Sequence, residues 1–198
     1  MHINKRLFRF LTILLIVFSL QCQSFAATAM DSRWANGQFK GFNLGNAKSS
    51  KINEKDFQRL KKYGANLLRI GLRITKGSNS INYKIEKVDE VFLDRIIASS
   101  KGSGISVVIT LGIYPGGDKS DYWGNESTKI SVGEIWKELA FKYKGNAQVV
   151  GFDLLNEPVI PKYSKLPGRD VWREWALHWS GRIREADAGT DQGGVFPD

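Results

Sequence analysis

The chain has almost no cysteine and almost no histidine. Its 198 residues contain one cysteine and two histidines. Cys22 lies in the first thirty residues, which we expect to be removed, so the mature chain would have no disulfide, no cysteine nucleophile and no zinc–thiolate site. His178 would then be the one histidine left, and a lone histidine in an aromatic helix packs more often than it binds a metal. We expect neither a metal nor another cofactor.

The first thirty residues have the layout of a secretory signal peptide. An apolar run covers residues 10–20, and the basic residues before it are Lys5, Arg6 and Arg9. Small residues follow, and cleavage after Ala26 or Ala29 is plausible. The run is shorter than the about 20 apolar residues that cross a bilayer, so a retained anchor is the weaker alternative. The sequence predicts a signal peptide over residues 1–29 and a mature domain over residues 30–198, secreted or periplasmic, with no membrane contact after cleavage.

The formal net charge of +9 raises the question of a nucleic-acid partner. The densest basic stretch lies mostly on one expected helix and consists of Lys48, Lys51, Lys55, Arg59, Lys61 and Lys62. Glu54 and Asp56 interrupt it, and no base-stacking motif accompanies it. We interpret the stretch as a solvated helix face and expect no nucleic-acid partner.

Short apolar strands alternate with amphipathic helices along the mature chain. Four strands are expected, over residues 39–44, 66–72, 105–111 and 149–155. Four helices are expected, over residues 53–63, 88–101, 131–143 and 170–186. A fifth strand is expected to begin near residues 193–196. Strands that are apolar on both faces, each followed by a helix with one apolar face, indicate an α/β fold with a parallel sheet. Periodicity alone does not separate a barrel from an open sheet.

Two helix boundaries carry specific signals. Asn53 is the expected N-cap of the first helix, and Gly64 is expected to end it. Ser131 and Glu134 have the spacing of a capping box, which predicts the start of the third helix at this position.

The fourth expected strand ends in Asn156-Glu157-Pro158. An acid at the carboxyl end of a buried parallel strand would lie at the mouth of a site. Pro158 disfavours the α conformation at Glu157, so we expect an extended residue there, and burial would raise the pKa of the Glu157 carboxyl. Such a group can donate a proton to a glycosidic oxygen. An ordinary strand-to-loop exit is the alternative, since Asn and Pro are common there.

With these residues the sequence resembles glycoside hydrolase family 5, the cellulase family of retaining (β/α)₈ barrels. The resemblance runs from about Gly37 to Asp187 and rests on segments 41–45, 68–70, 115–117 and 156–158. It implies an α/β (β/α)₈ TIM barrel, truncated to about the first four βα units, which form the N-terminal half of the catalytic barrel. It also implies a polysaccharide or oligosaccharide as the substrate.

The resemblance also implies roles for three residues. Glu157 would be the general acid/base, Asn156 would hold the 2-hydroxyl group of the sugar, and Arg69 would orient the nucleophilic carboxylate. For Arg69, a structural ion pair is an equally weighted alternative. The family carries its nucleophile on the seventh strand, and Gly112 stands where the family has a histidine. We expect no second carboxylate at a strand end here, because Asp153 is expected to point within its own strand.

Aromatic side chains in the loops after the strands are candidate platforms for sugar rings. Tyr114 and Trp123 follow the third strand and are predicted to bind substrate, with Tyr122 in the same loop and Tyr163 in the next. Three other tryptophans repeat at helical spacing and are expected to pack the last helix against the sheet: Trp172, Trp175 and Trp179.

The combined prediction is a secreted retaining endo-β-glycanase, cellulase-like, that cleaves O-glycosidic bonds by double displacement, here as an incomplete chain that lacks the nucleophile. A non-catalytic or degenerate carbohydrate-binding half-barrel is the alternative, motivated by the missing nucleophile and by Gly112. Four βα units would leave two unpaired strand edges and an uncovered apolar interior. We therefore expect residues 30–198 alone to be molten, aggregated or paired with another half-barrel.

Overall fold

The chain divides into two compact units, Met1–Gln38 and Phe39–Asp198. A computed structural model describes residues 32–44, 52–76, 82–113, 122–123, 125–160 and 167–188. The described part of the first unit contains one short helix, α2 (Ser32–Ala35), which the sequence did not predict. The expected signal peptide and the expected strand near residues 193–196 lie outside the described residues.

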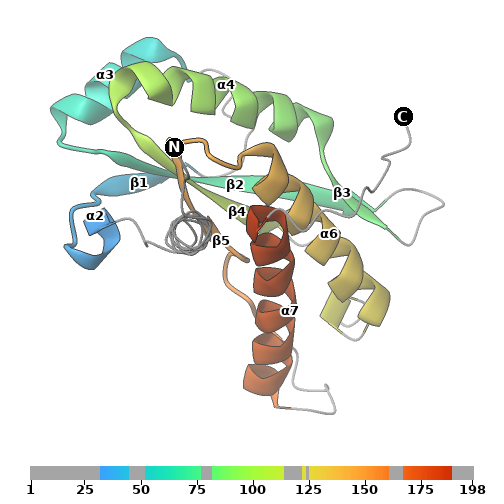
Figure 1. Cartoon of the computed structure of the whole chain (residues 1–198). Coiled ribbons are helices and arrows are strands. Elements are labelled where there is room, and N and C mark those ends of the chain that lie inside the picture. The colour runs from blue at the N-terminus through green and yellow to red at the C-terminus, as the bar shows by residue number, and fades with distance from the viewer. Residues whose placement is uncertain are drawn as a thin grey trace, which may run out of the picture. The chain divides into compact units, whose positions relative to one another are not determined.

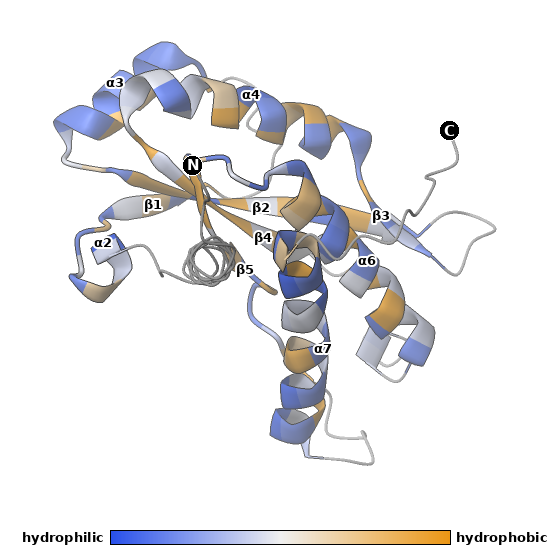
Figure 2. Cartoon of the chain, in the orientation of Figure 1, coloured by the Kyte–Doolittle hydropathy of each residue, from blue (hydrophilic) through white to orange (hydrophobic). Residues whose placement is uncertain are grey.

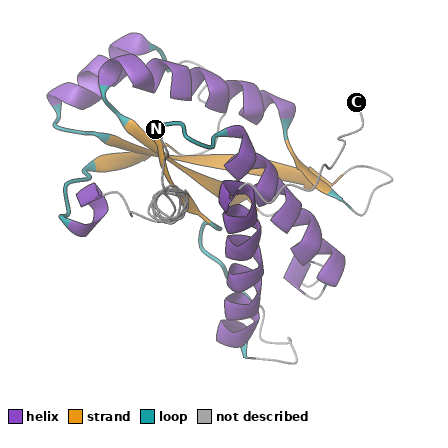
Figure 3. Ribbon diagram, in the orientation of Figure 1, coloured by secondary structure: helices purple, strands orange, loops and turns teal. Residues whose placement is uncertain are grey.

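Four parallel strands form the sheet of the second unit. Their order in the sheet is also their order in the chain: β1 (Gly41–Leu44), β2 (Leu67–Lys76), β4 (Ser106–Ile113) and β5 (Val149–Asp153). Parallel neighbours in chain order, joined by helices, are successive βα units. Figure 3 shows these strands running together with the helices packed beside them. The predicted parallel α/β sheet is confirmed.

Four helices belong to these units, and they are α3 (Glu54–Lys62), α4 (Lys87–Ser103), α6 (Glu126–Lys142) and α7 (Gly168–Ala188). α3 packs against α4 and α6 packs against α7, as Figure 1 shows. Each helix was predicted, with boundaries a few residues away from those observed. Gly64 ends α3 with a φ of 77°, the left-handed conformation that suits glycine at this position.

The two predicted helix starts had different outcomes. Asn53 caps α3, as predicted, and Asp56 completes a capping box with it that was not predicted. α6, in contrast, begins at Glu126, where the Asn125 side chain accepts a hydrogen bond from the Ser127 backbone N–H at 3.0 Å. The predicted start at Ser131 is therefore wrong.

Ser131 lies inside α6 and makes a tertiary contact. Its hydroxyl oxygen accepts a hydrogen bond from the backbone N–H of Tyr83 at 2.6 Å. Tyr83 opens the short strand β3 (Tyr83–Ile85), which pairs antiparallel with the end of β2 and was not predicted. The Ser131 hydroxyl, which the sequence predicted as a helix cap, therefore links α6 to the hairpin of β2 and β3.

The core lies between the helices and one face of the sheet. Alternate residues of the two central strands are almost fully buried, and they are Leu68, Ile70, Leu72, Val107, Ile109 and Leu111. Trp136 of α6 is also fully buried, and its ring centroid lies 5.7 Å from that of Phe152 in β5. Figure 2 shows the apolar residues concentrated in the strands, whereas α3 and α7 are largely hydrophilic. The residues that alternate with these six in β2 and β4 face the other side of the sheet, because successive side chains of a strand point to opposite faces.

A buried carboxylate fixes the end of β2. Asp89 of α4 has no exposed surface, and it accepts hydrogen bonds from the backbone N–H of Arg73 at 2.7 Å and from its Nη2 at 2.6 Å. The hydrogen bond to Asp89 raises the pKa of Arg73 above its ordinary value. This contact ties the start of α4 to the strand that carries the central site residue.

His178 packs between α6 and α7. Gly133 of α6 lies against it so closely that an added Cβ would be 2.8 Å from the His178 Nε2 atom. The part of the chain that the structure describes contains no group of three or more His, Cys, Asp or Glu side chains able to hold a metal ion. None of the helices described is both long and apolar enough to cross a membrane.

Replacing Gly41 with alanine should displace β1 from β2. The added Cβ would lie 2.0 Å from the backbone oxygen of Leu67, and a backbone atom inside a sheet cannot move aside. We expect the free energy of unfolding of the native protein to fall by about 3 kcal/mol in urea denaturation. Gly181→Ala in α7 is the control: nothing lies within 4 Å of its Cβ, and it should gain roughly 0.5–1 kcal/mol. Equal stabilities for the two variants would contradict the close approach of β1.

Asp94 joins α4 to the end of α6 and should make stability depend on acid pH. Burial pushes the pKa of Asp94 up, but hydrogen bonds from Lys142 at 2.9 Å and from the Tyr143 hydroxyl at 2.6 Å outweigh it, and the net pKa is lowered. The carboxylate therefore stabilises the fold above the unfolded pKa of about 3.9, and this contribution is lost as pH falls through the lower folded pKa.

The test compares Asp94→Asn with the native protein. Asparagine keeps the hydrogen-bond acceptor but cannot titrate, so the unfolding free energy of the variant should fall less steeply between about pH 5 and pH 2. Asp187→Asn, at an exposed position in the last turn of α7, is the control and should keep the native slope. Identical slopes for all three proteins would remove Asp94 from the acid response.

Candidate functional site

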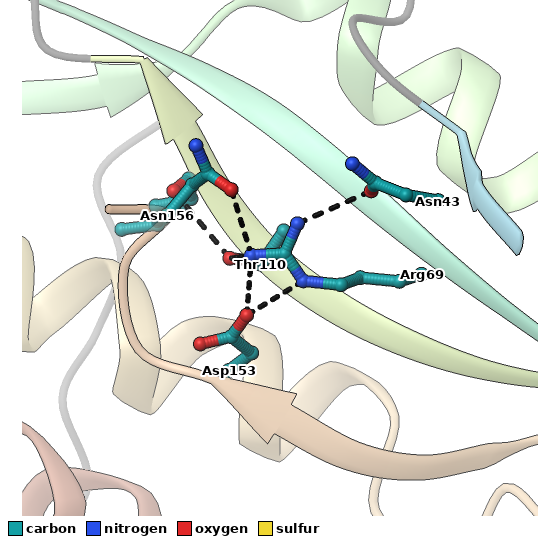
Figure 4. A network of polar contacts seen from close by, with 6 residues as sticks. Asn43, Arg69, Thr110, Asp153 and Asn156 are labelled. Atoms are coloured by element: carbon teal, nitrogen blue, oxygen red, sulfur yellow. Dashed lines mark hydrogen bonds and ion pairs between the residues drawn. The ribbon is translucent and has the colours of Figure 1, made fainter.

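Polar side chains from β1, β4, β5 and the segment after β5 converge on Arg69 of β2 (Figure 4). Its Nε donates to Asp153 Oδ2 at 2.6 Å, and its Nη1 donates to Asn43 Oδ1 at 3.1 Å. Its Nη2 donates to Thr110 Oγ1 at 3.3 Å and to Asn156 Oδ1 at 3.1 Å. Nη2 also forms an ion pair with Asp153. We call these five residues the Arg69 network.

Strand register brings the network together. Asn43 of β1 pairs directly with Arg69, and Thr110 of β4 pairs directly with Asp153 of β5. Arg69 alternates with the buried residues Leu68 and Ile70, so its side chain projects from the opposite face of the sheet, where its partners meet it. Asn156 follows β5, where its backbone N–H donates to Leu111 O at 2.9 Å and holds it beside β4. Asn43 and Asp153 lie at or next to the carboxyl ends of β1 and β5, whereas Arg69 and Thr110 lie within β2 and β4. The carboxyl ends of parallel strands are where active sites lie in barrels.

The chemistry of arginine fixes how the two amides are turned. A guanidinium group has N–H donors and no acceptor, so only the oxygen of a carboxamide can face it. Asn43 and Asn156 both turn their oxygens to Arg69, and Figure 4 shows the nitrogen of Asn156 pointing away from it. Arg69 uses neither NH₂ group, so each can donate to a ligand.

The sequence predicted Arg69 and Asn156 as site residues but missed Asn43, Thr110 and Asp153. Asp153 was expected to point within its own strand, and this is wrong, because its carboxylate lies on the site face and pairs with Arg69. A signal was present: Asp153 is the one polar residue of β5, and Thr110 interrupts the apolar run that follows Ser106 in β4. For Arg69 the structure contains the ion pair of the alternative interpretation, and its role in orienting a nucleophile stays a prediction.

Glu157 follows the network directly and differs from expectation in two ways. Its φ is 47°, in the left-handed region, so the expected extended conformation is wrong. Leu155 is buried in the core and Asn156 is bonded to β4, so the chain must turn at Glu157, where Pro158 disfavours the right-handed alternative. Glu157 is also exposed, so the expected burial is absent here. Left-handed backbone at a residue other than glycine is uncommon and clusters at functional sites.

Of the aromatic residues predicted as sugar platforms, some lie outside the described residues and the others are buried. Tyr114 and Tyr163 lie outside the described residues, and Gly112 lies in β4 near its end, as expected. Trp123 is only 5 % exposed, and its ring centroid lies 4.8 Å from that of Trp175 in α7. Trp123 therefore offers no open face to a sugar ring in this structure.

The helical tryptophans were expected to pack α7 against the sheet, but α7 packs mainly against α6, and Trp172 is only partly buried. Trp175 is 4 % exposed and Trp179 is fully buried. The indole N–H of Trp179 donates to the backbone oxygen of Lys129 in α6 at 2.9 Å. With Tyr122 and Trp123 they form an aromatic cluster that joins α7 to the segment before α6.

Comparison with known proteins identifies the class to which this fold and site belong. The sheet of βα units matches barrels of glycoside hydrolases over about half their length. The sequence profile of cellulase (glycosyl hydrolase family 5) matches residues 28–191. The chain therefore belongs to glycosyl hydrolase family 5.

A curated relative is a beta-xylosidase of Phanerodontia chrysosporium, 29 % identical over 118 residues, which are 54 % of this chain and 25 % of that protein. Among solved structures, endoglucanase Cel5A of Pseudomonas stutzeri with cellobiose has a TM-score of 0.56 at 20 % identity, over 74 % of this chain and 46 % of that one. Thermotoga maritima Cel5A with cellobiose has a TM-score of 0.56 at 24 % identity, over 75 % and 48 %. The chain thus spans about a quarter of the curated relative and about half of these structures.

Replacing Trp123 with alanine should destabilise the protein strongly, because the indole is part of the aromatic cluster. Loss of a buried tryptophan costs about 3–5 kcal/mol, and thermal or urea unfolding of the native protein would measure it. Leu177→Ala is the control, since Leu177 in α7 is 64 % exposed and its loss should cost no more than about 0.5 kcal/mol. If Trp123→Ala were as stable as the control, Trp123 would not be part of the buried cluster and would again be a candidate platform for a sugar ring.

Proposed function

We propose that this chain carries the acid/base part of a secreted retaining glycoside hydrolase that cleaves the O-glycosidic bonds of a polysaccharide. The observation that supports the proposal is the placement of Glu157 directly after Asn156, which is held by Arg69 at the carboxyl edge of the sheet. Membership of family 5 supports hydrolysis as the reaction class.

In this mechanism Glu157 first acts as an acid and then as a base. Its carboxylic acid donates a proton to the glycosidic oxygen that leaves, and a second carboxylate attacks the anomeric carbon to form a glycosyl–enzyme intermediate. Glu157, now ionised, takes a proton from a water molecule, and that water releases the sugar from the second carboxylate. The nucleophile belongs about 5–5.5 Å from the acid. Asp153 is committed to its ion pair with Arg69, so we place the nucleophile outside the described residues.

The exposure of Glu157 has a consequence for this mechanism. An acid that works near neutral pH needs its charged form disfavoured, and desolvation is the usual cause. Because Glu157 is exposed in this structure, we propose that the bound polysaccharide excludes water from it. The NH₂ group of Asn156 points away from Arg69 and would donate to a hydroxyl of the same sugar ring.

The substrate class follows from relatives and is part of the proposal. Two structures similar to this chain are endoglucanases bound to cellobiose, and the curated relative is a beta-xylosidase. We propose a β-linked glucan or xylan as the substrate. Such polymers do not enter cells, which agrees with the signal-peptide layout of the first thirty residues and with secretion.

A carbohydrate-binding protein without catalysis is the second candidate. The exposure of Glu157 favours it, as does the ion pair that occupies Asp153, the other carboxylate of the described site. It shares the donors of Asn43 and Asn156 with the hydrolase, so binding alone does not separate the two candidates.

The Glu157→Gln variant separates them. Hydrolysis of β-1,4-glucan or β-1,4-xylan by the native protein should fall between about 10²-fold and 10⁴-fold, because glutamine cannot donate the proton. An aryl glycoside with a good leaving group needs little protonation, so the first step on that substrate should be much less affected. Glu138→Gln, at an exposed position on α6, is the matched control and should retain native rates. Native turnover of polysaccharide by Glu157→Gln would remove this residue from the mechanism.

A further inference from the structure

Asp153 does not adjoin the proposed acid in sequence, yet it controls the group at the centre of the site. Its Oδ2 atom receives the Nε–H of Arg69 at 2.6 Å and also pairs with Nη2. We propose that Asp153 is a positioning residue, which holds Arg69 so that Asn43 and Asn156 present two NH₂ donors to one sugar ligand. This proposal deepens the hydrolase function proposed above and rests on it.

Asp153 fixes the plane of the Arg69 guanidinium group. All five N–H bonds of an arginine lie in one plane, so contacts at Nε and Nη2 fix the directions of the remaining ones. Asp153 makes both contacts from β5, two strands away from β2. Thr110 of β4 is fully buried between them, and its hydroxyl accepts from Nη2 at 3.3 Å. The guanidinium therefore has one orientation as long as Asp153 is ionised.

The positive charge of Arg69 is compensated by Asp153. Arg69 is 26 % exposed and its partner Asp153 is 39 % exposed, so both are only partly hydrated. Without the carboxylate, the guanidinium would keep its charge and gain by turning toward water or toward another anion. That movement would release the oxygens of both amides.

The contact with Arg69 decides which amide group Asn43 and Asn156 offer to a ligand. A carboxamide can show either its oxygen or its NH₂ group, and the contact with Arg69 selects one of the two. Asn43 of β1 gives its oxygen to Nη1, and Asn156, which follows β5, gives its oxygen to Nη2, so the NH₂ group of each is left for a ligand. Two donors suit a ligand rich in acceptor oxygens, and a pyranose ring has hydroxyl oxygens on neighbouring carbons. Asn43 thereby becomes a sugar-binding residue beside Asn156.

The test is a double-mutant cycle in the native protein. Asn156→Ala should lower kcat/KM on β-1,4-glucan or β-1,4-xylan by about 10²-fold, since loss of one positioned contact has an effect of this size. In the Asp153→Asn background, which keeps the size of the side chain and removes its charge, the same substitution should cost less than about 5-fold, because the amide is no longer positioned. Asn43→Ala should show the same loss of effect.

A spectroscopic measurement makes the test independent of turnover. The side-chain ¹⁵N–¹H resonances of Arg69 Nε, Asn43 and Asn156 should shift or broaden together in Asp153→Asn. Asp94→Asn is the matched control: its carboxylate is also half-exposed and paired to a cation, but it lies between α4 and α6, and the three resonances should stay in place. If Asp153→Asn does not fold, Asp153→Glu provides the same readout, since the longer side chain keeps the charge and displaces the guanidinium.

The outcomes distinguish the positioning role of Asp153 from the hydrolase function on which it rests. Unchanged resonances together with additive kinetic effects would overturn the positioning role, even if Glu157→Gln abolishes hydrolysis. Coupled resonances in a protein whose hydrolysis survives Glu157→Gln would retain the positioning role and reject the acid. Where turnover is too low for kinetics, the cycle is measured on the dissociation constant of cellobiose, and additivity there also overturns the proposal.

Discussion

The site depends on the need to compensate one positive charge on the open face of a parallel sheet. Arg69 projects from the second strand in the chain, and its carboxylate partner comes from β5, 84 residues later. Because the guanidinium has donors only, every group around it must supply an oxygen. This requirement selects an amide on β1, a hydroxyl on β4 and a carboxylate on β5. One charge thus aligns the strand ends that carry the site.

The helix-facing side of the sheet makes this arrangement rigid. In the central strands β2 and β4 the neighbours of Arg69 and Thr110 are almost fully buried, so these strands cannot rotate without exposing them. A similar fold of βα units occurs in solved glycoside hydrolases at low identity, and the chain spans about half of their length. The described residues therefore contain the Arg69 network and the glutamate that we propose as the proton donor.

Sequence patterns predicted what depends on local periodicity and missed what depends on pairing between distant segments. The parallel sheet, its helices and the cap at Asn53 follow from neighbours within a few residues. Asp153 was misjudged because the direction of its side chain is set by register with β4, which no local pattern encodes. Ser131 was misjudged because its spacing to Glu134 also occurs inside a helix. The left-handed turn at Glu157 arises from the anchoring of its neighbours, not from its own preference.

The hydrogen bond between Ser131 and Tyr83 links the outer layer of helices to the hairpin that extends β2. The strand β3 therefore cannot shift independently of α6, a helix that also contacts the aromatic cluster. A change in the position of this hairpin during evolution would then require paired substitutions, one in β3 and one on α6.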